Sequence, residues 1–180
     1  MMVVTATQCN GNISTAKLLL NARSKDAEHY KKEENKMKMN KVLFNIIHLV
    51  AAAQAHSDEG KINKSLYGET VKVLNFTGKT CDGGYPGKDD AILAAIKIID
   101  THKYMGVNYY VKDNGENVIV YFNFKIDGKR YQVSFHSFSN KLRKLIGKGS
   151  SCRWEKKMSC RETCQTLLKL CGKESEIYVY

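Results

Sequence analysis

The chain has 180 residues, 43% of them hydrophobic, and a formal net charge of +11 at pH 7. This length predicts one domain, or one domain with an appendage, and the hydrophobic content excludes a chain that is disordered throughout. No apolar run is long enough to span a bilayer, and the N-terminus lacks the basic and apolar regions of a secretory signal. We therefore expect a soluble, cytoplasmic protein.

The N-terminal part of the chain predicts an extension followed by a long helix. We expect residues 1–36 to form a flexible or helical N-terminal extension and residues 37–180 to form a single α+β domain. Residues 25–40 are nearly all polar helix formers, and apolar residues then recur at helical spacing over residues 42–53. The helix should end near Ser57–Gly60, with its first half exposed.

The stretch TGKTCDGGYPGKDD, residues 77–90, contains two Gly-Lys pairs and raises the question of a phosphate-binding loop. Such a loop needs a Gly five residues before the Gly-Lys pair, but Val73 and Asp82 occupy these two positions. The stretch is instead typical of turns, and Asp89 and Asp90 favour the positive end of a following helix. We therefore expect the Gly-Lys pairs to bind no nucleotide.

The clearest structural pattern lies between residues 107 and 138. Three runs, VNYYVK, NVIVYFNFKI and KRYQVSFHSF, alternate apolar and polar residues and are separated by Asn-Gly and Asp-Gly, which are strong hairpin signals. They predict a three-stranded antiparallel meander. A short strand is also predicted at Thr70–Phe76, and the C-terminal EIYVY could add a strand at the sheet edge.

The last third of the chain contains helix signals. Ser139 can cap a short basic helix, NKLRKLI, which Gly147 closes, and Ser159 and Glu162 have the spacing of a capping box for a final helix. The predicted fold class is α+β. It consists of a three-stranded antiparallel meander, four- or five-stranded if the other predicted strands join it, with helices packed on one face.

The positive charge is concentrated between Lys129 and Arg161. This window holds ten basic residues against the single Glu155, which is a net charge of +9. Such a cluster is typical of a surface that meets phosphates or an acidic partner, although a Lys-rich surface that only aids solubility has the same pattern. The candidate nucleic-acid or partner-binding residues of this window are Lys129, Arg130, Lys141, Arg143, Lys144, Lys148, Arg153, Lys156 and Lys157.

The predicted meander has an apolar and a polar face. The apolar face should join the core. The polar face gathers aromatic and cationic side chains, which suits base stacking and phosphate contact, but cross-strand Tyr and Lys neighbours are also ordinary on a solvated sheet. Tyr110, Tyr121 and His136 complete the candidate binding residues. The polar face consists of Asn108, Tyr110, Lys112, Tyr121, Asn123, Lys125, Arg130, Gln132, Ser134 and His136.

Six cysteines raise the alternative of a small Cys- or zinc-centred enzyme. Cys160 and Cys164 share one helix face and could bind zinc, with Cys152 and Cys171 or a His completing four ligands. However, leucines lie on the same stripe, where a free Cys behaves as a small buried hydrophobe, and the spacing matches no usual zinc motif. The core interpretation is therefore the better supported of the two.

Two histidines also have alternative roles. His136 could pair with Cys81 or Cys152 as base and nucleophile, but no local signature supports this. His48 interrupts an apolar helix face and fits a flanking or hydrogen-bonded core histidine better than a metal ligand. We assign no catalytic residue, no metal and no cofactor.

The run YQVSFHSF, followed by Trp154 and a short helix with Leu167 and Leu168, resembles small uncharacterised proteins carried by bacteriophages and mobile elements of AT-rich Gram-positive bacteria. The resemblance covers residues 88–171. Such genes often encode factors that bind host machinery in the host cytoplasm, anti-CRISPR inhibitors among them. Many anti-CRISPR proteins are acidic mimics of DNA, and a chain of charge +11 departs from that pattern.

We therefore predict a non-enzymatic binding protein of a phage or mobile element. It should engage nucleic acid or a host nucleoprotein complex through its basic surface, with inhibition of a CRISPR-type nuclease as the concrete expectation. The alternative from another class is the small Cys- or zinc-centred enzyme.

Overall fold

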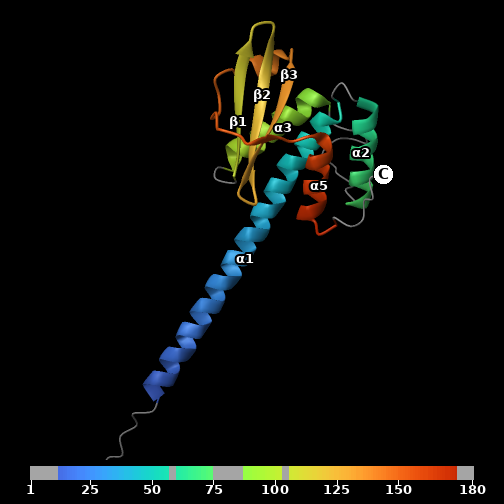
Figure 1. Ribbon diagram of the computed structural model, residues 1–180. Helices are drawn as coiled ribbons and strands as arrows, with labels where there is room; N and C mark the ends of the chain where they lie inside the picture. Colours follow the sequence, from blue (N-terminus) through green and yellow to red (C-terminus); the bar gives the residue numbers. More distant parts are fainter. Residues whose placement is uncertain (1–11, 57–59, 75–86, 103–105, 174–180) are drawn as a thin grey trace, which may run out of the picture. The chain divides into compact units, whose positions relative to one another are not determined.

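The computed structural model describes residues 12–56, 60–74, 87–102 and 106–173 (Figure 1). The chain divides into two compact units, Met1–Met39 and Asn40–Tyr180. The elements in chain order are α1 (Asn12–Gln54), α2 (Gly60–Val73), α3 (Lys88–Thr101), β1 (Val107–Asn114), β2 (Asn117–Ile126), β3 (Lys129–Ser137), α4 (Asn140–Arg143), β4 (Lys156–Lys157) and α5 (Cys160–Leu170).

Helix α1 confirms the predicted long helix. It begins at Asn12, before the polar run of residues 25–40 from which we predicted it. In the first unit, residues 22–34 are all exposed, as their polar composition leads us to expect. In the second unit, the residues of α1 from Ile46 onward are buried. Within the described residues, no helix has both the length and the apolar character needed to cross a membrane.

Helix α2 occupies most of the stretch for which we predicted the strand Thr70–Phe76, so that prediction is wrong. Asn63, Tyr67 and Thr70 recur at helical spacing and are buried, and Thr70 Oγ1 donates a hydrogen bond to the Leu66 carbonyl at 2.8 Å. The β-branched residues of this stretch favour a strand locally, but burial of the helical stripe outweighs that preference. The last two residues of the predicted strand lie outside the described part.

The predicted antiparallel meander of β1, β2 and β3 is confirmed. Tyr110 lies opposite Tyr121, and Tyr121 lies opposite Ser134. In the second turn Asp127 and Gly128 both have positive φ, +50° and +78°, as the Asp-Gly signal requires. In the first turn only Gly115 does, with a φ of +80°, because Asn114 still pairs with Asn117 at the end of β1. Strand β4 pairs parallel with β3 and completes a four-stranded sheet, so the sheet is mixed rather than wholly antiparallel.

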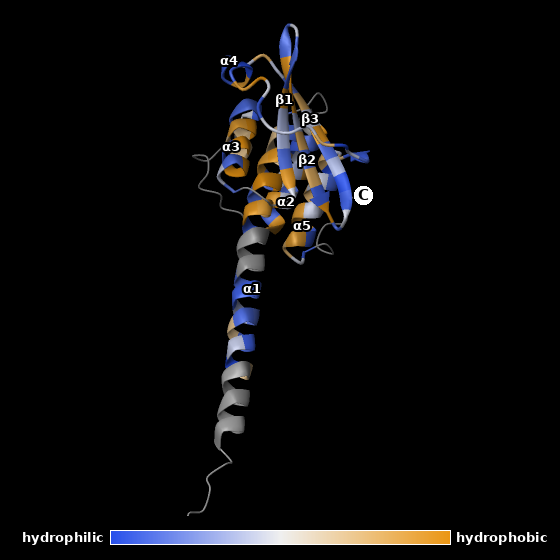
Figure 2. Cartoon of the chain, turned by 90° about the vertical axis from the view of Figure 1, so that its left-hand side faces the viewer, coloured by the Kyte–Doolittle hydropathy of each residue, from blue (hydrophilic) through white to orange (hydrophobic). Residues whose placement is uncertain are grey.

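The core of the second unit lies between the apolar face of the sheet and the helices (Figure 2). Val111, Val120 and Phe122 are fully buried, as the alternation predicts. The Phe122 ring meets Phe135 edge to face, with ring centroids 6.0 Å apart. Apolar residues of α1, α3 and α5 belong to the same cluster, so the helices pack on one face of the sheet and the other face is left to polar side chains.

The helix ends predicted for the last third of the chain are confirmed in part. The capping box is confirmed, because Ser159 Oγ accepts a hydrogen bond from the Glu162 N–H and Glu162 Oε2 accepts one from the Ser159 N–H. Gly147 ends the turns after α4 with a φ of +81°. Ser139 does not cap α4 through its side chain, contrary to the prediction. The C-terminal EIYVY lies outside the described residues.

Candidate nucleic-acid interface

Residues 147–157, which we call the strap, join the two outer edges of the meander. At one end, the Ser150 N–H donates to the Tyr109 carbonyl of β1 at 2.8 Å, and at the other end the Glu155 N–H donates to the Arg130 carbonyl of β3 at 3.0 Å. Because β2 lies between β1 and β3, the strap must cross the sheet, and it does so on the polar face (Figure 1). We call this face, together with the strap, the strapped face.

A glycine allows the strap to lie directly against β1. Gly149 forms a bridge with Tyr110 and has a φ of +88°. A Cβ atom at this position would collide with the Tyr109 carbonyl oxygen, so only glycine fits there. The strap thereby covers part of the outer edge of β1, whose backbone groups would otherwise lack partners.

The strap turns the centre of the polar face into a partly buried site. We expected an open face, but Asn123 and Gln132 are only 4% and 7% exposed. Their amides form a row across three strands: Asn123 Nδ2 donates to Asn108 Oδ1 at 2.7 Å, and Gln132 Nε2 donates to Asn123 Oδ1 at 2.9 Å. The thiol of Cys152 in the strap approaches Asn108 Oδ1 at 3.7 Å. Hydrogen bonds between these amides satisfy polar groups that are largely buried.

A pocket of about 380 Å³ opens between the sheet and the strap. Its volume lies in the range of small-molecule sites, about 300–1,000 Å³. All three long strands contribute to its floor, and the strap forms its roof. The sheet contributes Tyr110, Lys112, Tyr121, Asn123 and Gln132, and the strap contributes Ser151, Cys152 and Trp154.

Three aromatic side chains of this pocket have unengaged rings. Tyr110 and Tyr121 are direct cross-strand neighbours, and Trp154 is 41% exposed. Among the described residues, none of the three makes a ring contact or a side-chain hydrogen bond. Tyr110 and Tyr121 are half-buried, and all three side chains line the pocket without a ring or hydrogen-bond partner of their own in the described part of the chain. Sequence reasoning named the two tyrosines and missed Trp154, although a single tryptophan inside the basic window was a usable signal.

Lys112 lines the pocket, and further basic side chains belong to the strapped face. Lys125 and Arg130 are paired in register on the polar face, and the register of β4 with β3 places Lys157 on the same face. Arg153 belongs to the strap, and Lys148 lies where the strap meets β1. All five are exposed, and none forms an ion pair within the described part of the chain. Their positive potential is therefore not cancelled locally.

Other candidate cations lie elsewhere or are already engaged. Lys156 forms an ion pair with Glu162 of α5, and Arg143 donates to two carbonyls of the β1–β2 turn. Lys129 lines a second cavity, on the core side of the sheet. Lys141 and Lys144 are exposed in and just after α4, and neither lines the pocket beneath the strap.

His136 lies apart from the pocket. Its Nδ1 is 3.4 Å from Asn117 Nδ2, and its carbonyl accepts a hydrogen bond from Lys88 Nζ at 2.7 Å. The Cys152 thiol lies against the amide row instead, so the two side chains have different neighbours. Cys81, the other thiol we considered for a pair with His136, lies outside the described residues.

The second Gly-Lys pair, Gly87-Lys88, has structural contacts at the start of α3. Lys88 is engaged by the carbonyl of β3 described above. Asp89 Oδ1 accepts a hydrogen bond from Ser137 Oγ at 2.7 Å, and Asp89 and Asp90 stand in the first turn of α3, as predicted. These contacts tie α3 to the end of β3. The first pair, Gly78-Lys79, lies outside the described residues.

The cysteines of α5 are core residues. Cys160 and Cys164 are buried, as the core interpretation predicts, and Cys152 is half-buried. Cys171, at the end of the helix, is exposed, so the core interpretation is wrong for this residue. A hydrogen bond with Cys160 lowers the pKa of Cys164, burial opposes this shift, and a hydrogen bond with Thr70 adds to it. Among the described residues, no three His, Cys, Asp or Glu side chains are grouped so that they could hold a metal ion.

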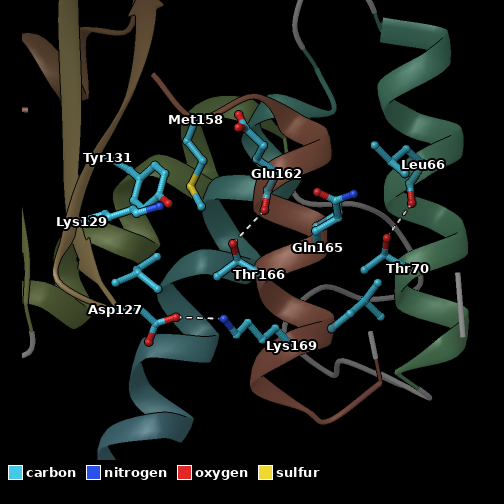
Figure 3. Close-up of a pocket in the computed structure, with 13 residues that line it drawn as sticks. Leu66, Thr70, Asp127, Lys129, Tyr131, Met158, Glu162, Gln165, Thr166 and Lys169 are labelled. Carbon is cyan, nitrogen blue, oxygen red and sulfur yellow. Dashed lines mark hydrogen bonds and ion pairs between the residues drawn. The ribbon is translucent and has the colours of Figure 1, made fainter. Parts of the chain in front are cut away.

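A second cavity of about 480 Å³ lies between the β2–β3 turn, α5 and α2 (Figure 3). Both of its acidic groups are paired with lysines: Asp127 Oδ2 is 2.9 Å from Lys169 Nζ, and Glu162 pairs with Lys156. Because both carboxylates of this cavity already have lysine partners, we do not assign a ligand to it.

None of the protein-family models, curated proteins or solved structures with which the chain was compared matches it.

Proposed function

We propose that this protein is a non-enzymatic nucleic-acid-binding protein and that the strapped face is its binding surface. The observation that carries the proposal is that one face combines cations that form no ion pair among the described residues with aromatic side chains that line a pocket. Cations that have no carboxylate partner are free to neutralise phosphates, and aromatic faces stack with bases. The strapped face supplies both kinds of contact in one place.

A surface that served only solubility would need the charges but not the pocket. Trp154 keeps 41% of its surface exposed beside Tyr110 and Tyr121, although burial of a large aromatic ring is favourable. An exposed aromatic cluster rimmed by polar residues is typical of an interaction site. The partly exposed aromatic side chains therefore favour a binding surface over a surface that serves only solubility.

The resemblance of the sequence to proteins of bacteriophages supports a finer proposal. The protein would be encoded by a phage or mobile element and act in the cytoplasm of the host cell. Its partner would be nucleic acid or a nucleoprotein complex, and a CRISPR effector nuclease is the concrete candidate. With a net charge of +11, the protein would bind the nucleic acid of such a complex rather than imitate it. Loss of target cleavage by a purified effector on addition of the protein is the expected result.

Charge reversal on the strapped face tests the proposal. Binding of a fluorescein-labelled oligonucleotide is measured by anisotropy across a salt series. The triple variant Arg130→Glu, Lys148→Glu, Arg153→Glu should lose most of its affinity at about 150 mM salt. The slope of log K against log salt should become shallower by about 0.7–0.9 for each phosphate that the variant no longer neutralises.

The matched control reverses three exposed lysines elsewhere in the second unit. The variant Lys41→Glu, Lys64→Glu, Lys97→Glu removes the same amount of charge from residues that are also exposed. It should bind nearly as well as the wild type. Equal losses in the two triple variants would mean that only net charge matters, and the proposal would fail.

A further inference from the structure

We propose that the pocket beneath the strap holds one unstacked base of a single-stranded nucleic acid. This inference rests on the proposed function and extends it, because it specifies the strandedness of the ligand and the side chains that hold its base. Three features of the pocket carry it: aromatic side chains from both the sheet and the strap, an amide on the sheet held in place by a hydrogen bond, and a volume that suits one nucleoside.

Aromatic surface lies on both sides of the pocket. Tyr110 and Tyr121 belong to the sheet floor, where they are cross-strand neighbours, and Trp154 belongs to the strap above it. A planar ring that enters the pocket can therefore contact aromatic side chains of both the sheet and the strap. Stacking of this kind accepts any base, since every base has a π-face. The volume of about 380 Å³ is at the small end of ligand sites and suits a single nucleoside.

Gln132 supplies hydrogen-bonding groups at the floor. It is 7% exposed, lines the pocket, and donates from Nε2 to Asn123 Oδ1 at 2.9 Å. This bond leaves the Gln132 Oε1 atom and the second Nε2 hydrogen without a partner among the described residues. A glutamine amide offers an acceptor and a donor side by side, which can pair with two atoms on the edge of one base. The amide row holds this group in position before a ligand arrives.

The strap decides between single and double strands. A base inside a duplex is covered on both faces and paired along its edge, so it must be flipped out before it can enter a pocket between the sheet and the strap, at an energetic cost. A single strand presents bases without that cost. Its phosphates, on either side of the bound base, would meet Lys112 in the pocket lining and exposed cations of the sheet and the strap, such as Arg130 and Arg153.

The test uses the intrinsic fluorescence of Trp154, which is the only tryptophan in the chain. The full-length protein is titrated with a single-stranded oligonucleotide of about a dozen nucleotides, a length typical of such sites, with the same sequence as a duplex, and with the four nucleoside monophosphates. We expect the single strand to quench Trp154 and to bind at least about tenfold more tightly than the duplex.

Variants of Tyr121 show whether stacking is responsible. Tyr121→Ala should weaken binding of the single strand by at least about fivefold, because one aromatic ring of the stack is removed, whereas Tyr121→Phe should retain the wild-type affinity. If Tyr121→Ala does not fold, Trp154→Ala and Trp154→Phe give the same comparison by anisotropy, because Trp154 is partly exposed and its replacement disturbs the core little.

The possible outcomes separate this inference from the proposed function. If no nucleic acid binds even at low salt, the proposed function itself is wrong. A second outcome would keep the proposed function and overturn the base pocket. In that outcome binding disappears in the charge-reversal variant, but single strand and duplex bind equally. Trp154 is then not quenched, and Tyr121→Ala still binds. Monophosphates that bind as tightly as the oligonucleotide would also overturn it, because the site would then take free nucleotides.

Discussion

His48 is a titratable side chain enclosed in the core of the second unit. It is 5% exposed, the Tyr67 hydroxyl lies 3.3 Å from its Nε2 atom, and the Phe44 ring stacks on it with centroids 6.0 Å apart. Burial lowers the pKa of His48 from 6.5 to about 4. The interpretation of His48 as a hydrogen-bonded core histidine is therefore confirmed, and the imidazole is neutral at neutral pH.

Because of this shift, His48 should make the folded state sensitive to mild acid. Between pH 6.5 and about pH 4, His48 is protonated in the unfolded chain but not in the folded one. Its contribution to stability is therefore complete above pH 6.5 and is lost as the pH falls toward 4. The free energy of unfolding should drop by about 3 kcal/mol from this group over that window.

The measurement is urea unfolding at several pH values, for the wild type and for His48→Phe. Carboxylates also titrate near pH 4, so the informative quantity is the difference between the two proteins. The phenylalanine variant should lose less stability than the wild type as the pH falls. Parallel pH profiles for the two proteins would contradict the assignment of the shift to His48.

At the scale of elements, the strap makes the site. The strands alone would present a solvated polar face, and the pocket exists because residues 147–157 cross it between two backbone attachments. Gly149 is the closest point of contact with β1, where both its φ of +88° and the Tyr109 carbonyl oxygen forbid a side chain. The pocket therefore depends on one glycine that does not itself line it.

Gly149→Ala should detach the strap from β1. The left-handed φ strains any L-residue and the new methyl group would collide with backbone, so we expect a loss of more than about 1 kcal/mol in the free energy of unfolding. Binding of single-stranded oligonucleotide should weaken as well. Thermal unfolding and the anisotropy assay measure the two effects.

Gly147→Ala is the matched control for this variant. Gly147 also has a positive φ, +81°, but nothing lies within 4 Å of a Cβ atom placed there. The Gly147→Ala variant should therefore have the backbone strain without the collision. It should lose less stability than Gly149→Ala and retain more of its affinity for single-stranded oligonucleotide. Equal effects of the two variants would show that the close approach of Gly149 to β1 contributes nothing to stability or to binding.

At the scale of the whole molecule, the buried residues are concentrated in one unit. The buried hydrophobic residues of the described chain run from Ile46 to Leu168, all within the second unit, Asn40–Tyr180. Residues 22–34 of the first unit are exposed throughout. The second unit therefore has the hydrophobic core that independent folding requires.

A chain that starts at Met39 should fold and bind on its own. It retains the core and the strapped face, so its thermal midpoint and its affinity for single-stranded oligonucleotide should match those of the full-length protein. Circular dichroism melting and anisotropy check this. A truncated chain that aggregates or melts without cooperativity would show that the first unit contributes to the stability of the second.

The sequence by itself determined the parts of this protein that depend on local chemistry. The meander follows from period-two alternation and from Asn-Gly and Asp-Gly turns, which need only neighbouring residues to adopt their conformation. The capping box at Ser159 and the acidic first turn of α3 are local in the same sense. The charge of the 129–161 window could also be read directly, because it depends only on composition.

Tertiary structure decided what depends on contacts between distant parts of the chain. Thr70 is helical rather than in a strand because a buried stripe, not local β propensity, sets the outcome. The strap pairs Ser150 with Tyr109 and Glu155 with Arg130, and no local pattern encodes such pairings. These long-range hydrogen bonds bring Trp154 to the same pocket as Tyr110 and Tyr121. The sequence therefore showed that a basic, aromatic surface exists, and the tertiary structure decided that it contains a pocket.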